Sequence, residues 1–81
     1  ELTEERRKSL IKILRDKTEE ARISLKLARE EVWKNIQDKE KNSEISEDDK
    51  FRLKDELQKI IDGISKEIEE MERKKELEIG N

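Results

Sequence analysis

Apolar residues recur at spacings of three, four or their sums along two long stretches of this chain. That periodicity places them on one face of a helix and is typical of amphipathic helices. The first stretch predicts a helix over about residues 3–41, with Thr3 as the N-cap and acidic residues in the first turn. Its apolar stripe consists of Leu10, Leu14, Ala21, Leu25, Ala28, Val32 and Ile36.

The periodicity stops once, over residues 42–46, and resumes in a second predicted helix over about residues 47–78. Ser46 suits the N-cap of that helix, because its hydroxyl can accept a backbone N–H two or three residues further on. Asp49 stands where a capping box places its carboxylate, although Glu or Gln is preferred there. The second apolar stripe consists of Leu53, Leu57, Ile60, Ile64, Ile68 and Met71, with Ile61 beside it.

The connection between the two predicted helices is too short for anything but an antiparallel pair. The 81 residues contain no proline and only two glycines, so little interrupts the helices. Gly63 weakens the second helix by about 1 kcal/mol relative to alanine without having to break it, and Gly80 suits its end. The predicted fold is therefore all-α, a single helical hairpin over residues 1–81.

Three apolar residues lie well away from the main stripe of the first helix: Ile13, Ile23 and Leu27. Two helices cannot cover both of these faces. We therefore expect either a missing third helix or association of chains with one another, so that the isolated hairpin would form a homo-oligomer.

The composition excludes several classes of function. With 53% charged and 30% hydrophobic residues, the chain has little material for a core. It has no cysteine and no histidine, which rules out disulfides, thiolate chemistry and imidazole metal sites. No apolar stretch is long enough for a membrane span or a signal peptide. Residues 1–41 carry 12 basic and 10 acidic side chains and residues 42–81 carry 8 and 13, so only the first segment favours an anionic partner.

A ridge of cationic and aromatic side chains runs along the first helix, about 100° round the helix from its apolar stripe. It consists of Arg15, Arg22, Lys26, Arg29 and Trp33, at spacings of 7, 4, 3 and 4 residues. One interpretation is an RNA-binding surface, because arginine forks match phosphate geometry and an indole can stack on a base or sugar. The other is structural: such residues commonly pair with acids of the neighbouring helix, and Trp33 would lie over the edge of the core. On the residues alone the structural interpretation is the commoner one.

Clusters of acidic residues do not make a catalytic or metal site. They occur at 19–20, 30–31 and 69–72, but adjacent residues on a helix point in different directions. No activating base, glycine loop or enclosed pocket accompanies them. We expect solvated faces, no enzyme activity, and no metal or cofactor.

Four stretches make the chain resemble the ribosome recycling factor family from Leu2 to about Ile79: LTEERRKSL, EEARISLKLAREE, EISEDD and DELQKIIDGISKEIEEMERKKELEI. The resemblance implies an L-shaped parent protein with a three-helix bundle and an α/β domain inserted after the first helix. This chain would supply the second and third helices of that bundle. The parent would bind large-subunit ribosomal RNA after termination and, with elongation factor G and GTP, promote subunit dissociation, without being an enzyme.

The resemblance also marks an RNA-facing stretch on the first of the two helices. Its matching positions are Arg22, Lys26, Arg29 and Glu30, and the key arginine falls on Arg29. Lys26 stands where arginine is usual, Glu30 replaces a basic residue, and Trp33 is unusual in its place. These departures hint at a divergent homologue, cytoplasmic if bacterial or from a mitochondrial or plastid matrix if eukaryotic.

The rival interpretation is a structural coiled-coil module for self-association or scaffolding. A third interpretation, an independent nucleic-acid-binding helix, fits the net charge of −3 less well.

Overall fold

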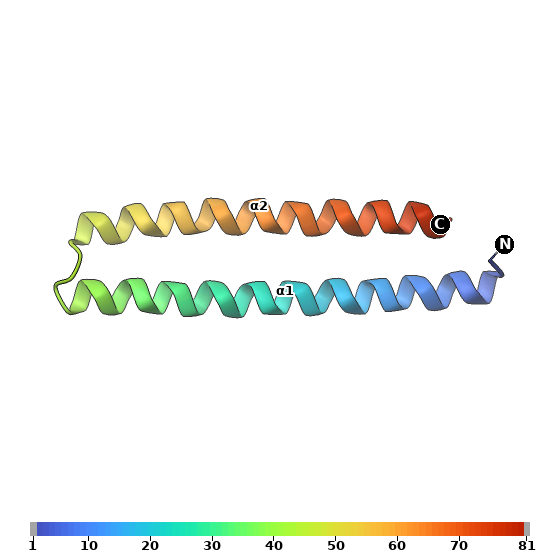
Figure 1. Cartoon of the computed structure of the whole chain (residues 1–81), viewed down its shortest axis with the longest axis horizontal. Coiled ribbons are helices and arrows are strands. Elements are labelled where there is room, and N and C mark those ends of the chain that lie inside the picture. The colour runs from blue at the N-terminus through green and yellow to red at the C-terminus, as the bar shows by residue number, and fades with distance from the viewer. Residues whose placement is uncertain (1, 81) are drawn as a thin grey trace.

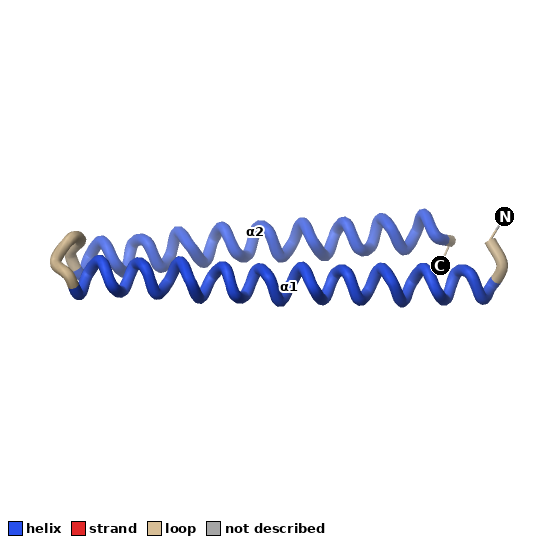
Figure 2. The backbone as a smooth tube through the Cα atoms, turned by 60° about the horizontal axis from the view of Figure 1, so that its bottom comes forward, coloured by secondary structure: helices blue, strands red, loops and turns tan. Residues whose placement is uncertain are grey.

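The computed structural model describes residues 2–80, which form two long helices joined by a tight turn. Helix α1 spans Glu4–Lys41 and helix α2 spans Glu47–Ile79. They run antiparallel and lie side by side, so that the start of α1 and the end of α2 share one end of the molecule (Figure 1 and Figure 2). The Cα atoms extend over 61 × 16 × 10 Å. The predicted all-α helical hairpin is confirmed, and residues 2–80 contain no strand.

The first helix begins and ends where polar groups meet its free backbone ends. The Thr3 hydroxyl accepts the backbone N–H of Arg6 at 3.1 Å, as the sequence predicted. At the other end, the Asn42 N–H donates to the Asp38 carbonyl at 2.9 Å. Ser43 then takes a positive φ of 60°, and the Glu44 N–H returns to the Lys39 carbonyl at 2.8 Å. This reversal turns the chain back along α1.

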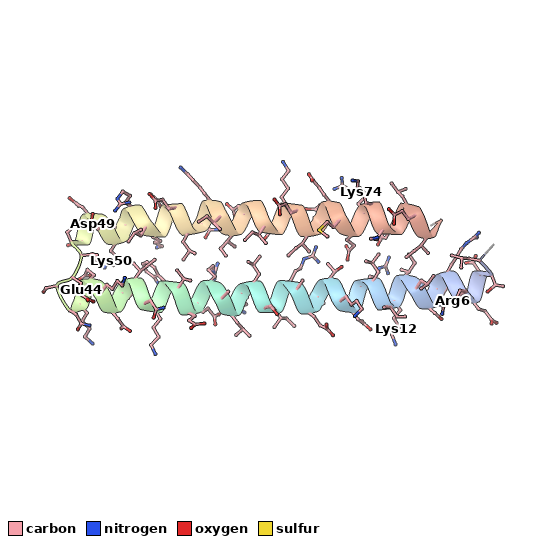
Figure 3. All side chains as sticks on the ribbon, viewed as in Figure 1. Arg6, Lys12, Glu44, Asp49, Lys50 and Lys74 are labelled. Carbon is pink, nitrogen blue, oxygen red and sulfur yellow. The ribbon has the colours of Figure 1, made fainter. Side chains whose placement is uncertain are left out.

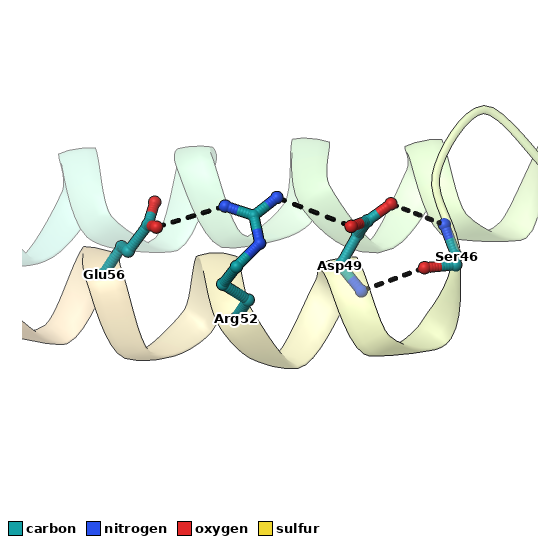
Figure 4. Close-up of polar contacts among 4 residues, drawn as sticks. All are labelled: Ser46, Asp49, Arg52 and Glu56. Atoms are coloured by element: carbon teal, nitrogen blue, oxygen red, sulfur yellow. Dashed lines mark hydrogen bonds and ion pairs between the residues drawn. The ribbon is translucent and has the colours of Figure 1, made fainter.

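Ser46 and Asp49 form a reciprocal capping box at the start of α2 (Figure 4). The Asp49 N–H donates to Ser46 Oγ at 3.0 Å, and the Ser46 N–H donates to Asp49 Oδ2 at 3.2 Å. Arg52 extends the cap, since its guanidinium bonds Asp49 Oδ1 at 3.5 Å and Glu56 Oε1 at 3.1 Å. These contacts, led by the bond from the Ser46 backbone N–H, lower the pKa of the Asp49 carboxyl below its ordinary value of 3.8.

Helix α2 ends at Gly80, beside a residue of the other helix. Gly80 takes the left-handed conformation with φ 89°, and its N–H donates to the Leu77 carbonyl at 3.1 Å. The last turn of α2 contains no basic residue. Arg7 of α1 lies near this end, because a Cβ added at Gly80 would be 3.6 Å from Arg7 Nε, and its Nη1 lies 3.8 Å from Glu4 Oε2. A cation beside the carbonyl end of a helix is favourable.

The core is a single line of contact between the two helices. Among the described residues only Thr18 and Ile36 are buried, at 7% and 8% exposure. The Thr18 hydroxyl donates to the Leu14 carbonyl at 2.9 Å, so burial leaves it satisfied. Half-buried apolar residues extend the line in both directions; they are Leu10, Ile11, Leu14, Ala21, Leu25, Leu53, Leu57, Ile61, Ile68 and Ile79.

Several residues of the predicted stripes lie to one side of this line instead. Val32, Ile60, Ile64 and Met71 remain 43%, 59%, 38% and 63% exposed. The reason is geometric: one partner helix covers only a narrow strip, and the last three residues lie roughly 80° round α2 from Ile61. Ile13, Ile23 and Leu27 are also exposed, as predicted, at 47%, 52% and 59%. Neither helix of the described chain is long and apolar enough to cross a membrane.

Candidate nucleic-acid interface

Two helices in contact leave a groove on each side of the contact line, and the two grooves of this hairpin differ in chemistry. One is mainly apolar and is lined from α1 by Leu10, Ile13 and Ala21 and from α2 by Ile68, Met71 and Ile79. The other, called here the basic groove, is lined by Arg22, Lys26, Arg29, Trp33 and Lys54 with apolar residues at its floor. The basic groove suits a polyanion better than the apolar groove does.

Three of the predicted ridge residues lie together in the basic groove with their charges available. Arg22, Lys26 and Arg29 are exposed and line one depression between Leu25 of α1 and Ile61 of α2. None of the three forms an ion pair with any residue between 2 and 80. Their spacing of four and three residues along one helix face matches the arrangement that the sequence predicted.

Arg15 differs from these three residues. Its Nε lies 3.7 Å from Oε1 of Glu76 on α2, and the two side chains are 65% and 25% exposed. This is the interhelical pairing that the structural interpretation of the ridge expects. Arg15 therefore lies outside the basic groove, toward the open end of the hairpin, where it lines a separate depression with Arg7, Lys8 and Lys12.

Trp33 lies half-buried at the edge of the contact line, and Lys54 of α2 covers its ring. The Lys54 ammonium is 5.4 Å from the centroid of the indole, within the range of a cation–π interaction. Arg29 and Glu30 of α1 and Leu57 and Gln58 of α2 complete a depression around this pair. The edge-of-core position of Trp33 agrees with its structural interpretation.

Lys54 is a residue that the sequence reasoning missed. The signal for it was present, because an antiparallel hairpin pairs residues at equal distances from its turn. Position 54 lies ten residues after Glu44, near the middle of the turn, and Trp33 lies eleven residues before it. The apolar stripe of α2 does not include Lys54 and therefore gives no sign of this pairing.

The neighbouring lysine, Lys50, differs from Lys54 because it forms an ion pair with an acidic residue of the other helix. Its Nζ lies 2.8 Å from Oε1 of Glu40 across the hairpin, and this hydrogen bond raises the Lys50 pKa. The side chain is only 20% exposed. In Figure 3 Lys50 lies between the helices near the turn, whereas Lys12 and Lys74 point outward. Lys50 therefore joins the helices and is not offered to a ligand.

The acidic clusters do not converge. The described residues contain no group of three or more Asp or Glu placed to hold a metal ion. Acidic side chains of α2 instead form local pairs with basic residues three or four positions away, such as Arg73 with Glu69 at 3.7 Å. This arrangement is that of a solvated helix face.

Comparison with known proteins decides the family. A family model described as ribosome recycling factor matches residues 1–79. This chain belongs to the ribosome recycling factor family. Members of this family are translation factors and not enzymes.

Three bacterial relatives are each named ribosome-recycling factor. The proteins of Alkaliphilus metalliredigens and Rubrobacter xylanophilus are each 44% identical over 79 residues, which is 98% of this chain and 43% and 42% of theirs. The protein of Carboxydothermus hydrogenoformans is 44% identical over 78 residues, 96% of this chain and 42% of its own. The chain thus spans less than half the length of these ribosome-recycling factors. No solved structure is significantly similar to it.

Proposed function

We propose that this chain is the ribosome-binding helical segment of a ribosome recycling factor. The whole protein would bind large-subunit ribosomal RNA after termination and, with elongation factor G and GTP, promote dissociation of the subunits. The observation that carries the proposal is the family match over residues 1–79, together with a groove whose cations suit an RNA backbone.

The charge of the basic groove supports RNA as the ligand. Four cationic side chains and one carboxylate, Glu30, line its two depressions, although the whole chain has a net charge of −3. A local concentration of positive charge favours phosphate contacts even on a protein whose net charge is negative. The apolar side chains that line the groove, Leu25, Leu57 and Ile61, shape it and cannot form ion pairs with the cations in place of a phosphate.

Within the groove, Arg29 is the residue that we expect to contribute most. It lines both depressions, one together with Arg22 and Lys26 and the other together with Trp33. Arginine can present two parallel N–H donors to one phosphate, whereas Lys26 offers a point charge. The carboxylate of Glu30, which lines the same depression as Arg29, would repel a bound phosphate. Arg15, which is paired with Glu76, would contribute little to the affinity for RNA.

The apolar groove supports a bundle that is larger than the hairpin. Ile13 and Met71, which line this groove, are 47% and 63% exposed, and Ile60 and Ile64 of α2 are also 59% and 38% exposed. The relatives contain more than twice the length of this chain. We propose that in a full-length protein a further helix covers this groove to give a three-helix bundle, with the two helices of the hairpin as its second and third members.

The same groove favours a second candidate function, self-association. With no third helix, two hairpins could cover each other's exposed apolar side chains and form a homo-oligomer, as in a structural coiled-coil or scaffolding module. The bacterial relatives favour a cytoplasmic translation factor. A eukaryotic source would instead place the protein in a mitochondrial or plastid matrix.

The experiment that separates the two candidates is sedimentation of the 81-residue chain with purified large ribosomal subunits. The recycling-factor proposal expects the chain to pellet with large subunits in a saturable and salt-sensitive manner, and to pellet far less with small subunits. A chain that stays in the supernatant at every salt concentration, while forming a discrete oligomer by light scattering, would favour the scaffold.

A further inference from the structure

Lys54 stands out among the basic residues of α2 because its charge faces the basic groove and has no acidic partner. It forms no ion pair within residues 2–80, whereas Lys50, one turn earlier, is held by Glu40 at 2.8 Å. Its ammonium instead lies 5.4 Å above the Trp33 ring, in the depression that Arg29 also lines. Two cations from different helices therefore border one opening.

The indole suits the task of holding this lysine. A free lysine side chain loses substantial rotamer entropy when it binds a ligand, and a ring face that attracts the ammonium restricts it beforehand. The aromatic contact leaves the N–H donors of the ammonium unused, unlike a carboxylate, which would take them and cancel the charge. A cation held in this way remains able to donate to a phosphate oxygen.

We propose that Lys54 is a phosphate-binding residue of the RNA-contacting surface and that Trp33 is the residue that positions it. The RNA backbone would then lie across the groove between both helices, bound by Arg29 from α1 and Lys54 from α2. This inference rests on the proposed function. It assigns Trp33 a role through Lys54 in place of direct stacking on a base, since the ammonium already occupies one face of the ring.

Glu30 provides an internal check, because its carboxylate lines the same depression as the two cations. A phosphate bound between Arg29 and Lys54 would be repelled by it. Glu30→Gln should therefore tighten binding about two- to three-fold, and more at low salt than at high salt.

The test uses the 81-residue chain and purified large ribosomal subunits, with the dissociation constant measured over a range of salt concentrations. Lys54→Gln should weaken binding about three- to ten-fold and reduce the slope of log K against log salt by about 0.7–1. Lys59→Gln is the matched control: it removes the same charge from an exposed lysine of α2 whose position is well away from the groove, and it should change neither value. Helix content by circular dichroism checks that each variant folds.

Trp33 is tested by a double-mutant cycle. Trp33→Leu should lose about two- to five-fold in affinity, the range of an exposed cation–π contact, and should cost little or nothing further when added to Lys54→Gln. Trp33→Phe, which keeps a weaker ring, should fall between the wild type and Trp33→Leu and carries the test if the leucine variant does not fold. In the wild type, ring current should move the Lys54 side-chain proton resonances upfield, and Trp33→Leu should abolish that shift.

The outcomes separate this inference from the proposed function. If Arg29→Ala weakens binding while Lys54→Gln does not, the groove binds RNA but the two-helix site is wrong. If the losses from Trp33→Leu and Lys54→Gln add fully, Trp33 contacts RNA independently and its positioning role is wrong. If the wild-type chain does not bind large subunits, both proposals are overturned.

Discussion

Replacing Ser46 with alanine should destabilise the hairpin, because this residue caps α2 at the point where the chain reverses. The Ser46 hydroxyl accepts the Asp49 N–H at 3.0 Å and is half of the reciprocal box that Asp49 completes. Loss of a serine N-cap costs about 1 kcal/mol, with a range of roughly 0.5–2 kcal/mol. At the closed end of the hairpin, fraying of α2 would also loosen the turn, so we expect at least the central value.

A loss of about 1 kcal/mol from the free energy of unfolding is large enough to measure. For a domain of this size 1 kcal/mol lowers the midpoint of thermal unfolding by about 4–8 °C. Thermal melts followed by circular dichroism at a fixed protein concentration give the shift directly. Ser46→Asp should retain most of the stability, because aspartate is an equally good cap. Thr3→Ala should cost less, because α1 can fray at its open end without disturbing the turn.

Two results would refute this reasoning. The first is a Ser46→Ala midpoint equal to that of the wild type, which would mean that the cap contributes nothing to the folded state. The second is a Ser46→Asp midpoint as low as that of Ser46→Ala, which would mean that the loss comes from something other than the missing acceptor.

Two further predictions follow from the capping box and from the apolar groove. Because the pKa of Asp49 is lowered in the folded chain, its contribution is present above its ordinary value of 3.8 and is lost as the pH falls through the lower folded value. Urea titrations at several pH values should therefore show stability rising with pH across that window, and Asp49→Asn should remove this part of the dependence, whereas an unchanged profile would contradict it. The exposed apolar side chains predict that the chain associates at high micromolar concentration, and that Ile60→Lys with Met71→Lys shifts it toward the monomer by light scattering. A strictly monomeric wild type would contradict that prediction.

The hairpin could be predicted from the sequence because local chemistry determines each of its parts. Ser46 with Asp49 defines the start of α2, Thr3 caps α1, and Gly80 can take the left-handed conformation that ends α2. Each of these depends on residues within four positions of one another. Short-range rules are sufficient for features of this kind.

Which face each helix turns to the other could not be predicted as well. The apolar stripes were wide enough to serve two neighbours, and periodicity cannot say which part a single partner covers. Thr18, which belongs to neither predicted stripe, is buried, while Ile60 and Met71 of the predicted stripe are exposed. The Trp33–Lys54 contact depends on the register between the helices, which only the pairing across the turn determines.

The central claim is that the basic groove binds large-subunit RNA, and Arg29→Ala tests it most directly. In a full-length protein that carries this segment, the affinity for purified large subunits should fall by about 1–3 kcal/mol, the range of a charged hydrogen bond. Lys34→Ala removes a charge from an exposed position elsewhere on α1 and should leave the affinity unchanged. Binding by the Arg29 variant that matches the wild type in a sedimentation or filter assay would contradict the claim.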